Sequence, residues 1–441
     1  MFEFWIQFAL VLTAILIGIR RGGVALGLIG GLGVAVLSFG FRVAPSEPPV
    51  TVMLIILAVV TASATLQVAG GLDYLVQQAE RVMRKHPQQI TLLAPLSTFL
   101  LTACVGTGHA VYSLLPVIAD VALKTRIRPE RPMAISSVAS QMGITASPVA
   151  AAVTTFLAMT AKSSEPVSLG QILMITVPAG VIGVIAAALW SFKRGLDLDQ
   201  DPEFLERMQD PEFRASVEKS VTTLDKALPA TAKLSVVLFF AGILSIVVLA
   251  LFPQLLPLAK GKPIPMTTVV QVVMLAFGAF ILFTANTKAA AIARSEVFTA
   301  GMIAVVSIFG IAWMSDTFVK ANEAFLVDNI KAMVEYAPWT FALAMFAVSA
   351  FVKSQAATLT IMLPFGLALG LSPQLLLGIL PSCYAYFFFA FYPSDLAAIN
   401  MDRSGTTRIG KYLLNHSFMV PGLIGVGVST VVAYALAQVY F

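Results

Sequence analysis

Two stretches of this apolar sequence carry the same unusual interruptions, one in each half of the chain. In the first half, Asp73 is followed by VGTGHAVYSLLP and then by TASP, which ends at Pro148. In the second half, Asp316 is followed by KSQAATLTIMLP and then by YPSD, whose proline is Pro393. The aspartate and the last proline are 75 positions apart in the first copy and 77 in the second. Interrupted apolar segments at matching places in two halves indicate the binding site of a transporter, so the sequence predicts a carrier for a small solute.

The composition places most of this chain in lipid. Hydrophobic residues make up 58% of it and charged residues only 12%, whereas soluble domains carry about 25% charged residues. The first apolar run, residues 4–19, is followed at once by a second, so we expect a retained span and not a signal peptide. Cys104 and Cys383 lie inside apolar segments, where small buried side chains are expected instead of a disulfide or a metal site.

We expect an all-α integral membrane protein with about ten membrane-spanning helices and two re-entrant hairpins. Each hairpin holds two apolar arms that are too short to cross the bilayer separately, joined by a small polar tip. Unpaired backbone at such a tip is tolerated only where protein or water covers it. The hairpins are predicted at residues 88–123 and 338–371, and the spans at 3–19, 24–41, 50–68, 132–161, 170–192, 234–257, 267–286, 298–319, 373–401 and 415–438.

Positive charge favours one orientation of these spans. The pairs Arg20–Arg21 and Lys193–Arg194 and the segment KTRIRPER (124–131) fall on one side, together with cations near 81–85, 288–294 and 403–411. Cytoplasmic loops carry an excess of Lys and Arg, so both termini are expected on the periplasmic side. The segment 320–336, with Glu323, Asp328 and Glu335, is expected outside, as are Lys162 and Lys260.

Five spans in each half invert the second copy relative to the first, which predicts two repeats related by an axis in the membrane plane. The first repeat is residues 1–192 and the second 234–441, joined by a cytoplasmic linker at 193–233. The linker contains DPEF twice and is expected to be partly helical, with a surface for partner docking as the alternative. The predicted scaffold is 1–86 and 234–336, and the predicted transport unit is 87–192 and 337–441.

The substrate is expected where hairpin tips and broken helices expose helix N-termini. Such ends carry unpaired N–H groups and about half a positive charge, so they attract anions. The second arms begin near Gly108 and Ala356, and proline interruptions create two more ends after Ser147 and Ser394. Four ends near the midplane suit a compact solute with two negative groups, although any one hydroxyl here can instead bond its own backbone. The predicted substrate-binding residues are Thr107, Gly108, His109, Thr145, Ser147, Ser354, Gln355, Thr358, Tyr392 and Ser394.

Three ionisable residues lie beside the interruptions, where a charge at the membrane centre costs at least about 2.5 kcal/mol. Lys353 and Asp395 either pair with each other, or Lys353 pairs with a substrate carboxylate while Asp395 titrates. His109 is either a proton carrier, since histidine titrates near neutral pH, or a helix-capping residue. Asp73 and Asp316 are expected to cap the N-termini of amphipathic helices.

These interruptions resemble those of the Dcu family of bacterial anaerobic four-carbon dicarboxylate transporters over essentially the full chain. The resemblance implies exchange of fumarate, malate or aspartate for succinate across the inner membrane, with proton-coupled uptake as a further mode. It also implies a hairpin-containing ion-transporter fold with a scaffold and a mobile domain. The stretches that carry the resemblance are LQVAGGLDYLV (66–76), GTGHAVYSLLPVIAD (106–120), ITASPVAAAV (144–153), KSQAAT (353–358), YPSDLAAI (392–399) and DRSGTTRIGK (402–411).

The closest alternative is a sodium- or proton-coupled dicarboxylate symporter, which would use the same hairpins. A channel is less favoured, because paired broken helices indicate alternating access. A membrane enzyme is least favoured, because neither a metal-ligand cluster nor a nucleophile–base arrangement is evident. No cofactor, metal or nucleic acid is expected as a partner, and a scaffold-mediated homodimer and a regulatory protein partner are left open.

Overall fold

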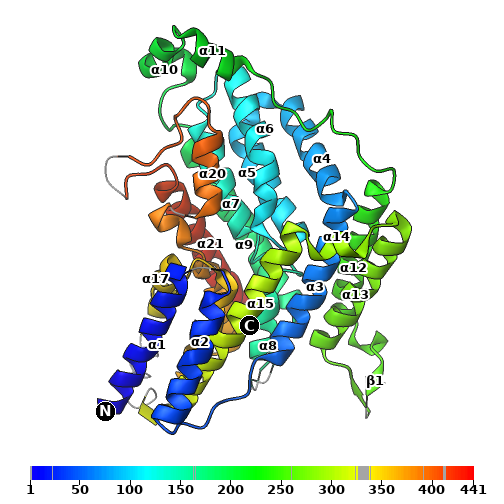
Figure 1. Ribbon diagram of the computed structural model, residues 1–441, viewed down its shortest axis with the longest axis vertical. Coiled ribbons are helices and arrows are strands. Elements are labelled where there is room, and N and C mark those ends of the chain that lie inside the picture. The colour runs from blue at the N-terminus through cyan, green and yellow to red at the C-terminus, as the bar shows by residue number, and fades with distance from the viewer. Residues whose placement is uncertain are drawn as a thin grey trace.

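The structure is a computed structural model that describes residues 2–21, 23–161, 163, 165–259, 261–322, 324–325, 337, 339–390, 392–410 and 414–441. Within these ranges the chain is helical apart from turns, loops and one antiparallel pair of strands, β1 (Leu258–Ala259) and β2 (Lys262–Pro263). Figure 1 shows the N-terminus at the end of the body opposite the short helices α10 (Pro202–Arg207) and α11 (Pro211–Glu218). The predicted all-α class is confirmed.

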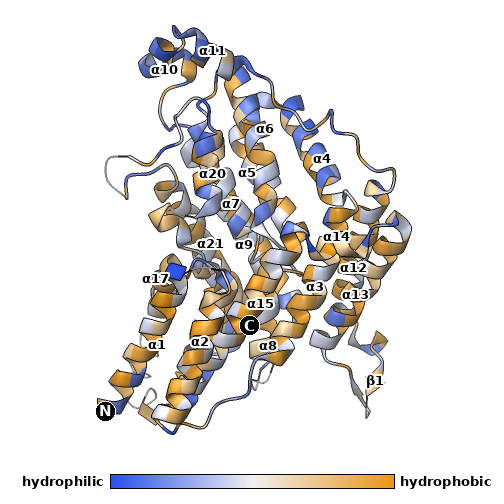
Figure 2. Ribbon diagram, in the orientation of Figure 1, coloured by the Kyte–Doolittle hydropathy of each residue, from blue (hydrophilic) through white to orange (hydrophobic). Residues whose placement is uncertain are grey.

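Seven helices of the described residues are long and apolar enough to cross a membrane. Figure 2 shows mainly hydrophobic residues along α15 and more hydrophilic ones on α10 and α11. Many large apolar side chains lie exposed on the long helices, as expected where lipid is the solvent. The chain is therefore a multi-pass membrane protein. The seven helices are α3 (Val50–Val68), Pro87–Val105, α9 (Leu169–Ser191), α12 (Ala232–Leu251), α13 (Met266–Ala285), α15 (Glu296–Ala321) and α21 (Met419–Tyr440).

Helix α1 (Phe2–Arg21) covers the first predicted span, and the remaining predicted spans are broken. Prolines at 148 and 393 lie at two of the breaks, because proline has no N–H with which to continue a helix. The predicted span 132–161 divides into two helices, and the span 373–401 divides into four short ones. These elements are α1 (Phe2–Arg21), α2 (Ala25–Ala35), η1 (Val36–Gly40), α7 (Glu130–Met142), α8 (Ala151–Thr160), α19 (Pro373–Gly378), η6 (Leu380–Cys383), η7 (Tyr386–Phe389) and α20 (Pro393–Met401).

Two helix pairs occupy the predicted hairpins. The first consists of η2 (Pro87–Gln89), α5 (Ile90–Val105), the tip η3 (Gly108–Ala110) and α6 (Val111–Lys124), and the second of α17 (Trp339–Val352) and α18 (Gln355–Ala368). In each pair the two long helices pack together. One expectation is wrong: the first arm is not too short, since residues 87–105 form an apolar helix of 19 residues. Pro338 lies outside the described residues, and the re-entrant paths stay a prediction.

The long helices pack in two groups. Helix α15 packs on α2 and α3 and also on α18 of the second hairpin, while α9 packs on α5, α7 and α21. The approach of α2 to α15 requires glycine, because a Cβ on Gly27 would lie 2.0 Å from the carbonyl oxygen of Val306. Membrane helices commonly gain packing through such small residues. The division into scaffold and transport unit stays a prediction, because α15 contacts helices of both.

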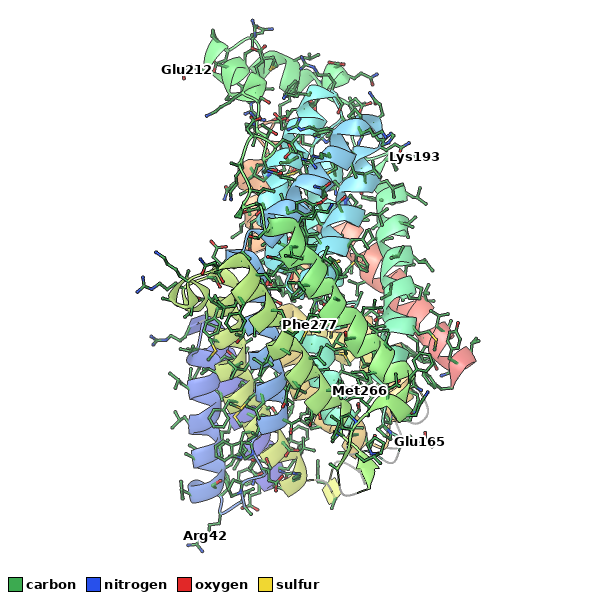
Figure 3. The ribbon with its side chains drawn as sticks, turned by 90° about the vertical axis from the view of Figure 1, so that its right-hand side faces the viewer. Arg42, Glu165, Lys193, Glu212, Met266 and Phe277 are labelled. Atoms are coloured by element: carbon green, nitrogen blue, oxygen red, sulfur yellow. The ribbon has the colours of Figure 1, made fainter. Side chains whose placement is uncertain are left out.

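Four labelled charged residues lie towards opposite ends of the molecule. Figure 3 shows Lys193 and Glu212 towards one end and Arg42 and Glu165 towards the other. This separation agrees with the sides of the membrane predicted for these segments. The predictions made for Lys162, Lys260, Glu323, residues 326–336 and Lys411 concern positions outside the described residues.

The linker is partly helical, as expected. Both DPEF copies begin a helix: the Asp201 side chain accepts the N–H groups of Glu203 and Phe204, and Asp210 accepts that of Glu212. In each copy proline follows at the first helical position. Aspartate before proline is a strong helix start, since the side chain satisfies an N–H that has no partner within the helix.

The extended part of the linker is anchored on α4 (Gly71–Lys85) through a buried carboxylate. Glu80 accepts hydrogen bonds from the Thr222 hydroxyl at 2.7 Å, the Thr223 N–H at 2.8 Å and Arg84 at 2.7 Å. Burial alone would raise the pKa of Glu80, but these hydrogen bonds outweigh it and the pKa is lowered. The linker therefore holds its place on α4 through an ionised side chain.

A second buried carboxylate, Asp120 of α6, also binds the linker. It accepts the Val221 N–H at 3.1 Å and forms an ion pair at 3.4 Å with Arg403, which follows α20. Further along, the linker returns to the start of α4, where a Cβ on Gly70 would lie 2.9 Å from Cδ of Pro229. The linker thus connects α4, α6 and the segment after α20.

Neither Asp73 nor Asp316 caps a helix, so that expectation is wrong. Helix α4 begins after Gly70, whose φ of 80° already turns the chain, and Asp73 in the first turn pairs with Lys226 at 2.8 Å. Asp316 lies inside α15 and pairs with Lys320 at 2.9 Å, one turn along the same helix. A capping residue must precede the helix, and α15 continues past Asp316.

Candidate substrate-binding site

A cavity of about 550 Å³ lies where both predicted hairpin tips meet both broken helices. Residues of α3 and α15, including Ser63 and Ser307, form another part of its wall. Of the ten predicted substrate-binding residues, five line this cavity: Thr107, His109, Ser354, Gln355 and Tyr392. Lys353 lines it as well.

The first tip is shaped by two glycines with different functions. Gly106 ends α5 with a φ of 85°, and a Cβ there would lie 2.9 Å from the carbonyl oxygen of Val149. Thr107 is extended, and its hydroxyl accepts the N–H of His109 at 3.4 Å. Gly108 packs against the side-chain amide of Gln141 instead of lining the cavity. The tip therefore presents Thr107 and His109 to the cavity and keeps Gly108 behind them.

The second tip begins helix α18 at the cavity wall. Lys353 has a left-handed backbone with a φ of 55°, and Ser354 is the N-cap, whose hydroxyl accepts the Ala357 N–H at 3.3 Å. The Ser354 carbonyl accepts both the N–H and the hydroxyl of Thr358. Thr358 thus bonds its own helix and lies away from the cavity, whereas the first turn of α18 lines it.

The side-chain amide of Gln355 is engaged by the protein. Its Nε2 donates to the carbonyl oxygen of Gln141 at 2.6 Å and lies 3.4 Å from the Tyr386 hydroxyl, which donates to Oε1 of Gln141 at 2.9 Å. The Cys383 thiol is 3.9 Å from Oε1 of Gln355. The two cysteines are free thiols, Cys383 buried and Cys104 partly exposed. Gln355 therefore joins the second tip to α7, near the first tip.

Gln141 and Tyr386 were not predicted from the sequence. A buried amide within an apolar helix, two residues before the break that follows α7, is a signal that could have identified Gln141, because buried polar groups need partners. Nothing local distinguishes Tyr386 from the neighbouring aromatic residues. Its importance comes from the fold, which brings its hydroxyl to Gln141.

Thr145 and Ser147 shape the first break instead of lining the cavity. The Thr145 hydroxyl donates to the Met142 carbonyl at 3.1 Å, and Ser147 accepts the Val149 N–H at 3.3 Å. Turns occupy the residues up to 150, so α8 begins at Ala151, later than expected. The N-terminal residues of α8 line the cavity.

At the second break, Ser394 and Asp395 are buried in the first turn of α20 and do not line the cavity. The Ser137 hydroxyl lies 2.8 Å from the Ser394 hydroxyl and 2.6 Å from Oδ1 of Asp395. Because a hydroxyl has one hydrogen, only one of these can accept from Ser137 at a time. Asp395 also interacts electrostatically with Lys353. A carboxylate in the first turn is stabilised by the helix dipole.

The geometry suits anion binding more than catalysis. The N-terminal residues of α8, α18 and α20, and the short turn η3 that precedes α6, line one cavity. Within the described ranges, no group of three or more His, Cys, Asp or Glu side chains is placed to hold a metal ion. The chemistry on offer is hydrogen bonding from hydroxyls and helix N–H groups.

A solved structure shares this fold. The YdaH transporter of Alcanivorax borkumensis superposes with a TM-score of 0.58, over 94% of this chain and 96% of that one. The two sequences are only 12% identical. The likeness therefore concerns the architecture alone.

Sequence relatives are much closer. The anaerobic C4-dicarboxylate transporter DcuB of Escherichia coli O6:H1 is 45% identical over 441 residues, 99% of each chain. The C4-dicarboxylate transporter DcuA of Wolinella succinogenes is 38% identical over 98% of this chain and 99% of its own. Both are named as transporters and not as enzymes, and the family described as anaerobic C4-dicarboxylate membrane transporter matches residues 3–441. The resemblance predicted from the sequence is confirmed: the chain belongs to the anaerobic C4-dicarboxylate membrane transporter family.

Proposed function

We propose that this protein exchanges four-carbon dicarboxylates across the bacterial inner membrane, taking in fumarate, malate or aspartate and releasing succinate. The observation that carries the proposal is that the first residues of three helices, and the turn that precedes a fourth, line one cavity. The names of the relatives, which specify C4-dicarboxylates, support the same substrate class.

The partial charges of the helix ends explain why such a protein would exchange dicarboxylates instead of returning across the membrane with an empty site. Each helix N-terminus carries about half an elementary charge, so four ends supply roughly the two charges that neutralise a dianion. Lys353 and Asp395 contribute opposite charges and leave this sum unchanged. The empty cavity, with its uncompensated positive ends, would cross the membrane poorly, whereas the loaded cavity crosses with little net charge.

The proposal is tested by counterflow in proteoliposomes loaded with succinate. Thr107→Ala and Ser354→Ala each remove a side-chain acceptor from a tip. A lost cap costs about 1 kcal/mol of local stability, so each tip should become less ordered and fumarate uptake should fall. Thr430→Ala is the matched control, because its hydroxyl donates to the Val426 carbonyl within its own helix, α21. Unchanged uptake in both tip variants would remove the tips from the substrate site.

Movement is proposed to follow the division into two units. The moving unit would be residues 87–192 and 337–441, and the static unit residues 1–86 and 234–336. Both termini would lie in the periplasm. Any homodimer contact or regulatory partner would bind outside the moving unit. Cysteine labelling of Ser63→Cys from each side of the membrane, with and without succinate, tests this. Labelling from one side only under every condition would contradict alternating access.

A sodium- or proton-coupled symporter is the second candidate. Oδ2 of Asp395 is buried and has no hydrogen-bond partner among the described residues, which is the environment of a group that accepts a proton or a cation. Uptake into empty vesicles that needs a sodium or pH gradient would favour symport. Uptake that needs only internal succinate would favour exchange.

A further inference from the structure

A second cavity lies on the other side of α3 from the substrate cavity. It encloses about 350 Å³ between α3, α13, α15 and the short helix α14 (Ala289–Ala293). Val59, Val60 and Ser63 of α3 line the substrate cavity, whereas Thr61, Ala62 and Thr65 line the second one. At 100° per residue these two sets point in nearly opposite directions. We call the second cavity the α3–α13 groove.

The α3–α13 groove presents hydrocarbon and little hydrogen-bonding capacity. Its two α3 hydroxyls bond their own helix: Thr61 donates to the Leu57 carbonyl at 2.7 Å and Thr65 to the Thr61 carbonyl at 2.8 Å. The remaining lining includes Leu282, Ile292 and Phe298. Water is poorly held in such a space, because a buried water needs two to four polar partners. The chemistry favours an alkyl chain.

Positive charge beside the groove indicates which kind of lipid would supply the alkyl chain. Lys288 and Arg294 flank α14 and are both exposed, against one nearby acidic residue, Glu296. Between the groove helix α13 and α14, the Thr287 hydroxyl is buried without a hydrogen-bond partner among the described residues. These cations fall on the side predicted to be cytoplasmic. Basic sites between membrane helices on that side bind anionic lipid head groups.

We propose that the α3–α13 groove binds one acyl chain of an anionic phospholipid, with its phosphate held by Lys288 and Arg294. The bound chain supports the wall of the substrate cavity from behind. In that wall α15 packs closely on α3, because a Cβ on Gly301 of α15 would lie 2.2 Å from Cγ1 of Val60. Both helices line both cavities, so a chain that positions α3 also positions the substrate cavity. Only this transport consequence rests on the proposed function.

Binding is tested by native mass spectrometry of the purified full-length protein after partial delipidation. Phosphatidylglycerol and phosphatidylcholine with identical chains are the probes. Two variants separate head group from chain: K288Q/R294Q removes the cations, and Ala279→Leu fills the groove, which Ala279 lines. The control is K193Q/K233Q, which removes two cations that, unlike Lys288 and Arg294, do not adjoin a groove-lining residue in the sequence.

The wild type and the control are expected to retain phosphatidylglycerol in preference to phosphatidylcholine. Loss of two surface cations should weaken phosphatidylglycerol roughly tenfold or more, and Ala279→Leu should weaken both lipids. Equal retention by K288Q/R294Q and the control would overturn the head-group site. Displacement of the lipid by soluble glycerol phosphate alone would overturn the chain site.

Counterflow in vesicles of each lipid tests the consequence for transport. Wild-type uptake is expected to be several-fold faster in vesicles that contain phosphatidylglycerol, and K288Q/R294Q is expected to lose this difference. A lipid-independent wild-type rate would refute the support of the wall while leaving the proposed exchange intact. Absence of succinate-dependent uptake in every lipid would refute the exchange and leave the lipid site to the binding experiment.

Discussion

Replacing Gly108 with alanine perturbs the contact between the first tip and α7. A Cβ on Gly108 would lie 2.3 Å from Nε2 and 2.6 Å from Oε1 of Gln141. The Gln141 side-chain amide cannot swing aside at no cost, because its Oε1 accepts the Tyr386 hydroxyl and its Nε2 donates to the Ser140 hydroxyl. The substitution must therefore either displace the tip or break this hydrogen-bond network.

The two outcomes have comparable costs. Overpacking a tight contact costs about 1–3 kcal/mol, and leaving a buried hydrogen-bonding group without its partner costs about 1–3 kcal/mol. We therefore expect Gly108→Ala to destabilise the protein by about 2 kcal/mol or more. Thr107 and His109 of this tip line the cavity. Displacement of the tip would move both residues, so the KM for fumarate should rise as well.

The assay combines thermal unfolding in detergent with counterflow KM measurement. Gly427→Ala is the control, since nothing lies within 4 Å of the Cβ that it adds. The double variant G108A/Q141A removes the clash and should be less destabilised than the sum of its single substitutions. Additive effects in the double variant, or a Gly108→Ala protein with unchanged stability and KM, would refute the proposed contact.

Two further substitutions test buried carboxylates. Glu80→Gln should accelerate proteolysis of the linker at pH 7, since Glu80 accepts from Thr222 and Thr223. Because the folded pKa of Glu80 is lowered, its stabilising contribution is present above the unfolded value of about 4.3 and is lost as the pH falls through the folded value. The wild-type linker should therefore become as sensitive to proteolysis as the Glu80→Gln linker only in strong acid. Ser137→Ala removes a donor to buried Asp395 and should lower the free energy of unfolding by about 1.5–3 kcal/mol; an unchanged melting temperature would count against this bond.

Features set by local chemistry could be predicted from the sequence. The breaks near Pro148 and Pro393 and the tips at Thr107 and Ser354 lie where glycine, proline and capping hydroxyls occur, because these residues limit the backbone wherever they stand. The two DPEF helices follow from the same rule. Family membership followed from the combination of these signals.

Features set by tertiary packing could not be predicted in this way. Thr145 and Thr358 have the residue type of a ligand, but their hydroxyls bond backbone carbonyls of their own segments. The Gln141–Tyr386 hydrogen bond joins residues 245 positions apart, and no local pattern specifies such a pair. The capping role predicted for Asp316 was wrong because α15 begins well before this residue, and a cap must precede its helix.

The contact between Gly70 and Pro229 has a consequence for how the molecule could move. The linker binds α4 through Glu80 and α6 through Asp120, so it connects a helix of the predicted scaffold to the first hairpin of the predicted transport unit. Near Pro229 it lies beside Gly70, at the start of α4. Movement of the hairpin against the scaffold would then have to carry the linker with it or break one of these two contacts.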